Sequence, residues 1–210
     1  MGHAITTVPT FAKTGGIKMS KSRLESFSDD LFSIIITIMV LQLTIPATKD
    51  WSAIFNSQWL SALFAYTVSF VLITSFWVSH QNIVANLDTI TPSILWANSV
   101  FLFLTSLVPI FTAWFGQFPD SSAAAIAYGT DYTLSILALY FVAGATVNKI
   151  NDPKQRERLH HVNRGRLTLV GFGAATTALG AIWPPIAGIA VFTISSVWIA
   201  RTIVISKRRR

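Results

Sequence analysis

The chain has 210 residues, of which 52% are hydrophobic and only 12% are charged, and its mean hydropathy is +0.54. This balance excludes an ordinary soluble domain and predicts an all-α protein with several membrane-spanning helices. The absence of cysteine excludes disulfides and thiolate metal sites. The formal net charge of +7 would suggest an acidic partner such as nucleic acid in a soluble protein, so the distribution of the basic residues along the chain matters.

The chain is predicted to contain one membrane domain with two short extensions. Residues 1–21 lack the apolar stretch and small-residue cleavage site of a signal peptide, and we expect a flexible cytoplasmic arm. Residues 22–205 form the predicted six-helix transmembrane domain, and residues 206–210 form a basic cytoplasmic tail.

Six apolar segments are predicted as membrane spans, because each is close to the roughly 20 residues that a helix needs to cross the hydrocarbon core. They are residues 27–46, 59–80, 94–115, 122–146, 166–183 and 186–205. Pro46 ends the first segment. Pro184 and Pro185 separate the last two, since tandem prolines cannot donate backbone hydrogen bonds within a continuing helix.

The basic residues predict the orientation of these spans. All of them except Lys49 fall within residues 1–23, 149–166 and 201–210. Because Lys and Arg near span ends are retained in the cytoplasm, both termini are expected on the cytoplasmic side of the inner cell membrane, which requires an even number of spans. The basic surplus then follows from topology, and nucleic-acid binding is not needed to explain it.

The first span divides into two faces. Ser22 and Glu25 form an S-x-x-E capping box, which predicts a helix start near residue 23. At about 100° per residue, one stripe follows the helix within about 60° of Ile34, and Asp29 lies about 140° away from it. The stripe contains Phe27, Asp30, Ile34, Thr37, Ile38, Leu41 and Ile45.

Polar residues from the first three spans are expected at one depth near the cytoplasmic side. They are Arg23, Asp29, Trp77, His80 and Asn98. Ionisable groups at membrane depth are costly unless they are paired, so an Arg-Asp-His arrangement would fix the first span to the second. In the alternative, Arg23 and His80 extend separately to the lipid headgroups.

Three stretches together resemble one family, the transmembrane protein 175 potassium channels. The first is R-x-x-x-F-S-D at Arg23, Phe27, Ser28 and Asp29, followed by the run I-I-I-T-I-M-V-L. The second is W-x-x-H at Trp77 and His80, and the third is A-N-x-x-x-L-F-x-x-S-x-x-P from Ala97 to Pro109. The three occur in the expected order and cover the first half of the chain.

The resemblance implies a homotetramer in the lipid bilayer with six spans per subunit and a central pore that prefers potassium among monovalent cations. It implies that the first span lines this pore and that the constriction consists of Ile34, Leu41 and either Thr37 or Ile38. The chain has no T-V-G-Y-G filter, which fits that family. An apolar constriction selects by the cost of removing hydration water, which favours potassium modestly over sodium.

The resemblance also implies that Arg23, Asp29 and His80 form the network that holds the pore helix. No cofactor and no metal other than permeant potassium are expected. Asp30 departs from the family pattern, which has a small residue there, and we expect four copies to ring the cytoplasmic mouth and concentrate cations.

Two other functional classes remain open from the sequence. A secondary transporter would use broken helices, and Pro109 with the glycines of the fifth span (Gly171, Gly173 and Gly180) could be interpreted in that way. No internal repeat supports it, and we expect those glycines to allow close helix packing. A membrane enzyme is disfavoured because the spans lack catalytic motifs, with Asp131 as the one isolated carboxylate of the fourth span.

Overall fold

The computed structural model describes residues 20–46, 48–147 and 149–207, without the side chains of residues 201–207. The predicted arm before Ser20 and residues 208–210 of the predicted tail lie outside this range. Six α-helices and one turn of 3-10 helix make up the described structure, so the predicted all-α class with six helices is confirmed. They are α1 (Lys21–Val40), η1 (Trp51–Ala53), α2 (Ser57–Val84), α3 (Pro92–Gln117), α4 (Ser122–Val147), α5 (Pro153–Gly180) and α6 (Ile186–Lys207).

Three of these helices, α2, α3 and α4, are long and apolar enough to cross a membrane by length and composition. In α6 the apolar part is shorter and covers Ile186–Ala200. The first turns of α1 are charged, and so is the first half of α5, which lowers their hydropathy. The spanning role of α1, α5 and α6 therefore stays a prediction.

Helix α1 begins two residues before the predicted start near residue 23, and with a different N-cap. The helix begins at Lys21, and the Ser20 hydroxyl accepts a hydrogen bond from the backbone N–H of Arg23 as its N-cap. Ser22 and Glu25 therefore lie inside the helix and do not form a capping box. Glu25 instead lies 4.0 Å from the ammonium of Lys21, one turn earlier on the same face.

The fifth helix also begins earlier than its apolar segment. Asp152 caps it by accepting a hydrogen bond from the backbone N–H of Lys154 at 2.9 Å, and Pro153 occupies the first helical position. The charged residues after Pro153 have helix propensities similar to those of apolar residues, so α5 continues without interruption to Gly180. Pro184 and Pro185 separate α5 from α6 as predicted.

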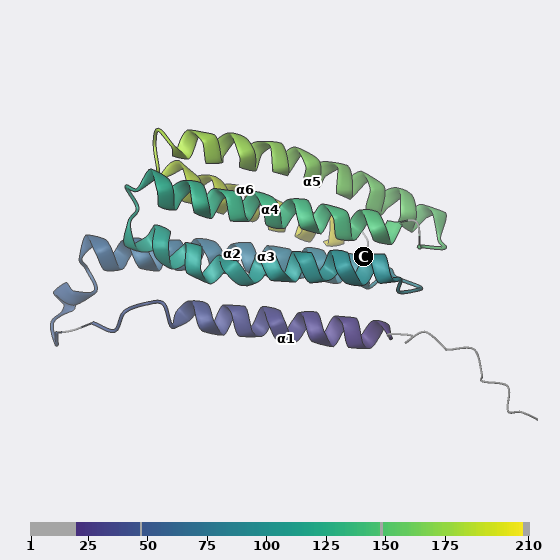
Figure 1. Ribbon diagram of the computed structural model, residues 1–210, viewed down its shortest axis with the longest axis horizontal. Helices are drawn as coiled ribbons and strands as arrows, with labels where there is room; N and C mark the ends of the chain where they lie inside the picture. The colour runs from purple at the N-terminus through teal and green to yellow at the C-terminus, as the bar shows by residue number, and fades with distance from the viewer. Residues whose placement is uncertain (1–19, 47, 148, 208–210) are drawn as a thin grey trace, which may run out of the picture.

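The helices form a bundle in which α1 is an outer layer. Figure 1 shows α1 along one side of the bundle, α5 on the opposite side, and α2, α3, α4 and α6 between them. Helix α1 contacts α2 and α3, whereas α4 packs against both α3 and α5. The buried core runs through the layers from Phe32 to Leu159.

The start of α1, the end of α2 and the start of α5 lie at one end of the bundle. The Lys21 ammonium donates to the backbone oxygen of Ala85 at 2.7 Å, and the backbone N–H of Asn151 donates to Asp88 at 3.0 Å. The late part of α6 reaches the same half of the bundle, because the Trp198 indole donates to Ser79 at 2.7 Å.

Candidate functional site

Helix α1 presents one face to the bundle and leaves the other uncovered. The buried positions recur every three or four residues, which is the spacing of one face of a helix. They are Leu24, Ser28, Phe32, Ile35 and Met39, and all pack toward α2 and α3. The absence of a helix breaker before Leu41 keeps this face continuous for the full length of α1.

The opposite face carries the stripe that the sequence predicted to line a pore. Ile34 is 55% exposed, Ile38 is 44% exposed and Leu41 is 76% exposed in the single subunit. The other exposed members are Phe27, Asp30, Thr37 and Ile45. Leu41 is the C-cap residue of α1, whereas Asp30 lies in the middle of the helix.

Asp29 connects α1 to α2. Its carboxylate accepts a hydrogen bond from the indole Nε1 of Trp77 at 2.9 Å and another from the side-chain amide of Gln81. Both donors reach the same carboxylate oxygen, Oδ1, because Trp77 and Gln81 are one helical turn apart on α2. The half-buried carboxylate therefore holds α1 in a fixed rotation against α2.

A second polar group joins all three N-terminal helices deeper in the bundle. His80 Nε2 lies 2.7 Å from Oδ1 of Asn98, and the Asn98 amide donates to Ser28 Oγ at 3.2 Å. Ser28 in turn donates to the backbone oxygen of Leu24 at 2.8 Å. All three side chains are buried, so each hydrogen bond also removes the cost of an unsatisfied polar group.

The hydrogen bond of His80 to Asn98 places a proton on Nε2. The amide oxygen of Asn98 can only accept, so Nε2 donates to it. The other nitrogen, Nδ1, is buried without a hydrogen-bond partner among the described residues. The ring stacks on Phe101 with centroids 5.8 Å apart, and Phe32 lies 5.9 Å away.

Arg23 takes part in neither group. It is exposed, and within residues 20–207 as described its guanidinium has no hydrogen bond or ion pair with Asp29 or His80. The helix explains this placement, since Arg23 and Asp29 lie about 120° apart around α1. The structure therefore brings Asp29 to Trp77, and His80 to Asn98, as two neighbouring pairs.

Thr37 combines an exposed position with a fixed hydroxyl. Its Oγ1 donates to the backbone oxygen of Ser33 at 2.8 Å, one turn earlier in α1. With its proton used in this way, the oxygen keeps its lone pairs for an outside partner. Thr37 is thus the position of the stripe that can offer a neutral oxygen ligand between Ile34 and Leu41.

Gln81 and Ser28 have roles that the sequence analysis did not assign. Gln81 follows Trp77 by four residues and therefore lies on the same face of α2, a spacing that could have identified it. Ser28 had been named only as part of the family signature. Among the described residues there is no group of three or more His, Cys, Asp or Glu side chains placed to hold a metal ion.

Comparisons with known proteins match the same part of the chain. The family model described as "Endosomal/lysosomal potassium channel TMEM175" matches residues 23–109. A protein named as a potassium channel in Chryseobacterium sp. (strain P1-3) is 30% identical over 182 residues, which is 86% of this chain and 93% of that protein. A protein named as a potassium channel in Streptomyces collinus is 29% identical over 121 residues, covering 56% of this chain and 58% of its own length.

A solved structure has the same fold. The crystal structure of a lysosomal potassium-selective channel TMEM175 homolog from Chamaesiphon minutus superposes with a TM-score of 0.72 at 21% sequence identity. The match covers 86% of this chain and 97% of that one, so it includes helices of both halves. The resemblance found in the first half of the sequence therefore extends to the fold of nearly the whole chain.

Proposed function

Because the chain belongs to the TMEM175 potassium channel family, we propose that it conducts potassium through a central pore lined by α1 of four identical subunits. Membership in a family of channels confirms that this multi-pass membrane protein is not an enzyme. The observation that carries the proposal is the uncovered stripe of α1, on the face opposite to the one that packs against the bundle.

The composition of this stripe favours water over lipid as its neighbour. Asp30 lies on it and is exposed, and a carboxylate that faces lipid hydrocarbon would be strongly unfavourable. In a tetramer with α1 nearest the axis, Asp30 faces an aqueous mouth. Ile34 and Leu41 then form successive apolar rings farther along the same pore.

Selection in such a pore depends on hydration. Apolar rings give a cation no oxygen ligands, so a cation with weakly held water passes more readily, and this favours potassium over sodium. Four Thr37 hydroxyls, each already donating to its own helix, would add one ring of acceptor oxygens between the apolar rings. Asp29, Trp77 and Gln81 set the rotation of α1 that directs this stripe to the axis.

The end of the bundle that holds the start of α1 faces the cytoplasm in this proposal. The described parts of the basic segments, residues 20–23, 149–166 and 201–207, lie at or toward that end, and basic residues are retained on the cytoplasmic side. Both termini are then cytoplasmic, and the membrane is the inner cell membrane.

A flux assay in liposomes under a potassium gradient tests the proposal. Rapid, electrogenic and non-saturating potassium flux is expected, and Ile34→Trp should abolish it by filling the constriction. Ile189→Trp is the matched control, because Ile189 lies on α6 with a similar exposure of 47%. Slow flux that saturates and requires a coupling ion would instead indicate a secondary transporter, and unchanged flux in Ile34→Trp would place the pore elsewhere.

A further inference from the structure

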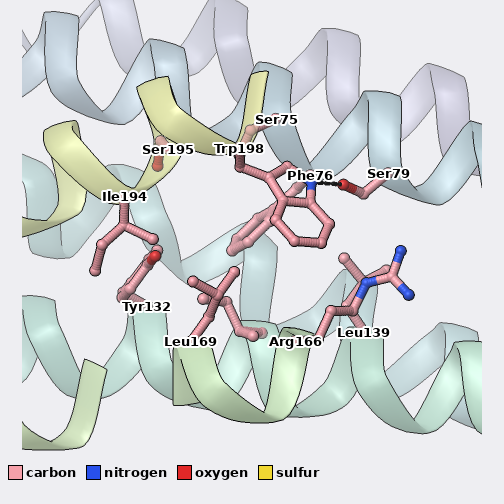
Figure 2. A pocket seen from close by; sticks show the side chains of 11 residues that line it. Ser75, Phe76, Ser79, Tyr132, Leu139, Arg166, Leu169, Ile194, Ser195 and Trp198 are labelled. Carbon is pink, nitrogen blue, oxygen red and sulfur yellow. Dashed lines mark hydrogen bonds between the residues drawn. The ribbon is translucent and has the colours of Figure 1, made fainter. Parts of the chain in front are cut away.

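A small cavity lies between α2, α4, α5 and α6, away from the α1 stripe. It has a volume of about 20 Å³, which is room for one water molecule or one monatomic ion. Figure 2 shows its lining, with Arg166 beside the ring of Trp198 and a dashed line from Trp198 to Ser79. Most of the other lining side chains are apolar.

Among the described residues, no negatively charged side chain neutralises Arg166. The side chain is only 2% exposed, and its Nε is buried without a hydrogen-bond partner in this part of the chain. One terminal nitrogen donates to the Asn163 side-chain oxygen at 3.3 Å, and the guanidinium carbon lies 5.7 Å from the centre of the Trp198 ring. These contacts are favourable, but none supplies a negative charge.

No carboxylate lines the cavity, and the one ion pair among the described residues is between Lys21 and Glu25. Asp131 is buried on α4 but is not part of the lining. A guanidinium that is removed from water without a counter-charge is strongly destabilising. The site is therefore short of one negative charge.

Four hydroxyl groups line the cavity, and they differ in their availability as hydrogen-bond donors. Ser75 Oγ already donates to the backbone oxygen of Leu72 at 2.7 Å. Ser79 Oγ accepts from Trp198, which leaves its own proton free to donate. Ser195 Oγ is buried and has no hydrogen-bond partner among the described residues, and in Figure 2 it lies with Tyr132 on the side of Trp198 opposite to the guanidinium.

We propose that this cavity binds one halide-sized anion, with chloride as the physiological candidate, held by Arg166 and the Ser79 hydroxyl, which lie on the same side of Trp198 in Figure 2. A water molecule could satisfy Nε but would leave the positive charge in place. The bound anion would join α5 and α6 to α2 and so stabilise the half of the bundle that lies away from the pore.

The test is the thermal stability of the purified protein in an uncharged detergent, followed by tryptophan fluorescence. Replacing chloride with gluconate, which is too large for the cavity, at constant potassium should lower the apparent Tm by about 3 °C. Arg166→Met should make the Tm independent of the anion. The matched control is Arg164→Met, an exposed arginine on the same helix, which should keep the full response.

A second measurement does not depend on the folding of Arg166→Met. Wild-type crystals grown in bromide should give an anomalous peak inside the cavity beside Arg166, and Ser79→Ala should weaken it. Equal Tm values in chloride and gluconate, or a cavity that holds only water, would overturn the proposal. Recovery of the Tm in gluconate by added phosphatidylglycerol would identify a lipid phosphate oxygen as the ligand and would also overturn it.

Discussion

The indole Nε1 of Trp77 donates a hydrogen bond to the carboxylate of Asp29 at 2.9 Å, and this bond joins the last third of α2 to the first half of α1. Gln81 donates to the same carboxylate oxygen. Asp29 lies on the side of α1 away from Ile34. Substitutions at Asp29 therefore test how α1 is held, separately from what the proposed pore contains.

Asp29→Ala should destabilise the protein, because it leaves the Trp77 and Gln81 donors without their acceptor. Hydrogen bonds to charged groups contribute about 1.5–3 kcal/mol each, and partial exposure reduces this, so we expect a total loss of about 2 kcal/mol. The apparent Tm in detergent measures the change. Asp30→Ala, which removes a neighbouring exposed carboxylate, is the control and should leave the Tm nearly unchanged.

His80 and Asn98 should show strong energetic coupling. Each single replacement, His80→Leu or Asn98→Leu, leaves a buried polar partner unsatisfied and should cost about 1–3 kcal/mol. The double replacement removes both groups, so its cost should be smaller than the sum by about 1 kcal/mol. Thermal unfolding of the wild type, the two single variants and the double variant gives a double-mutant cycle. Strictly additive losses of stability would mean that the 2.7 Å contact between His80 and Asn98 adds no stability of its own.

Thr37→Val tests the proposed ring of oxygens in the pore. The change keeps the shape of the side chain and removes the hydroxyl, so potassium conductance should fall several-fold and the preference for potassium over sodium should decrease. Planar-bilayer recordings with both ions measure this. Thr193→Val is the matched control, because Thr193 is exposed on α6 and its hydroxyl makes the same bond to its own helix at 2.8 Å.

If Ile38 forms the middle constriction, Thr37→Val should leave the reversal potential unchanged. In that case Ile38→Thr should shift it, because the polar side chain would then enter the narrowest part of the pore.

Asp30→Asn should lower cation conductance at low salt if four carboxylates ring the cytoplasmic mouth. The local cation concentration depends on this charge, and the effect should disappear above about 1 M salt, where the screening length is about 3 Å. Single-channel recordings across ionic strengths measure the difference. Asp120→Asn removes an exposed carboxylate at the other end of the bundle and serves as control; equal conductance in Asp30→Asn at every salt concentration would refute the proposed ring.

Gly173→Ala should destabilise the contact between α4 and α5. A Cβ atom at this position would lie 2.6 Å from Thr133 Oγ1, and this overpacking costs about 1–3 kcal/mol. Gly171 is the matched control on the same helix, because a Cβ atom there meets nothing within 4 Å. Gly171→Ala should therefore raise the apparent Tm slightly through better helix propensity, and a loss as large as that of Gly173→Ala would contradict the packing argument.

The sequence predicted the features that depend on composition and periodicity. Six helices, the break at Pro184 and Pro185, and the uncovered stripe from Phe27 to Leu41 follow from apolar length, proline chemistry and the helical repeat. The two polar pairs, Asp29 with Trp77 and His80 with Asn98, agree with the common depth expected for these residues. Depth alone does not specify partners, so Gln81 was missed.

The features that depend on three-dimensional packing were not predictable in the same way. Ser20 and Ser22 are both of a residue type that favours the N-cap position. Which of them caps α1 depends on the residue at which the backbone becomes helical. The charged half of α5 lies before the predicted span of residues 166–183, because hydropathy does not distinguish an exposed helix from a loop, although Asp152 and Pro153 form a helix-start signal. Gly171 has no close neighbour within the subunit, contrary to the expectation that it allows close packing.

The peripheral position of α1 has a mechanical consequence. Because α2 and α3 are the only described helices with which α1 shares several contacts, a tilt of α1 would repack those two contacts and leave the packing of α4, α5 and α6 on each other unchanged. Such a tilt is resisted by the buried face, which ends at Met39, and by the hydrogen bonds of Ser28 and Asp29. Beyond the helix, Trp59 Nε1 donates to the backbone oxygen of Thr44 at 3.0 Å. In the proposed tetramer, a tilt about Asp29 would change the width of the pore more at Leu41, which is about three turns away, than at the adjacent Asp30.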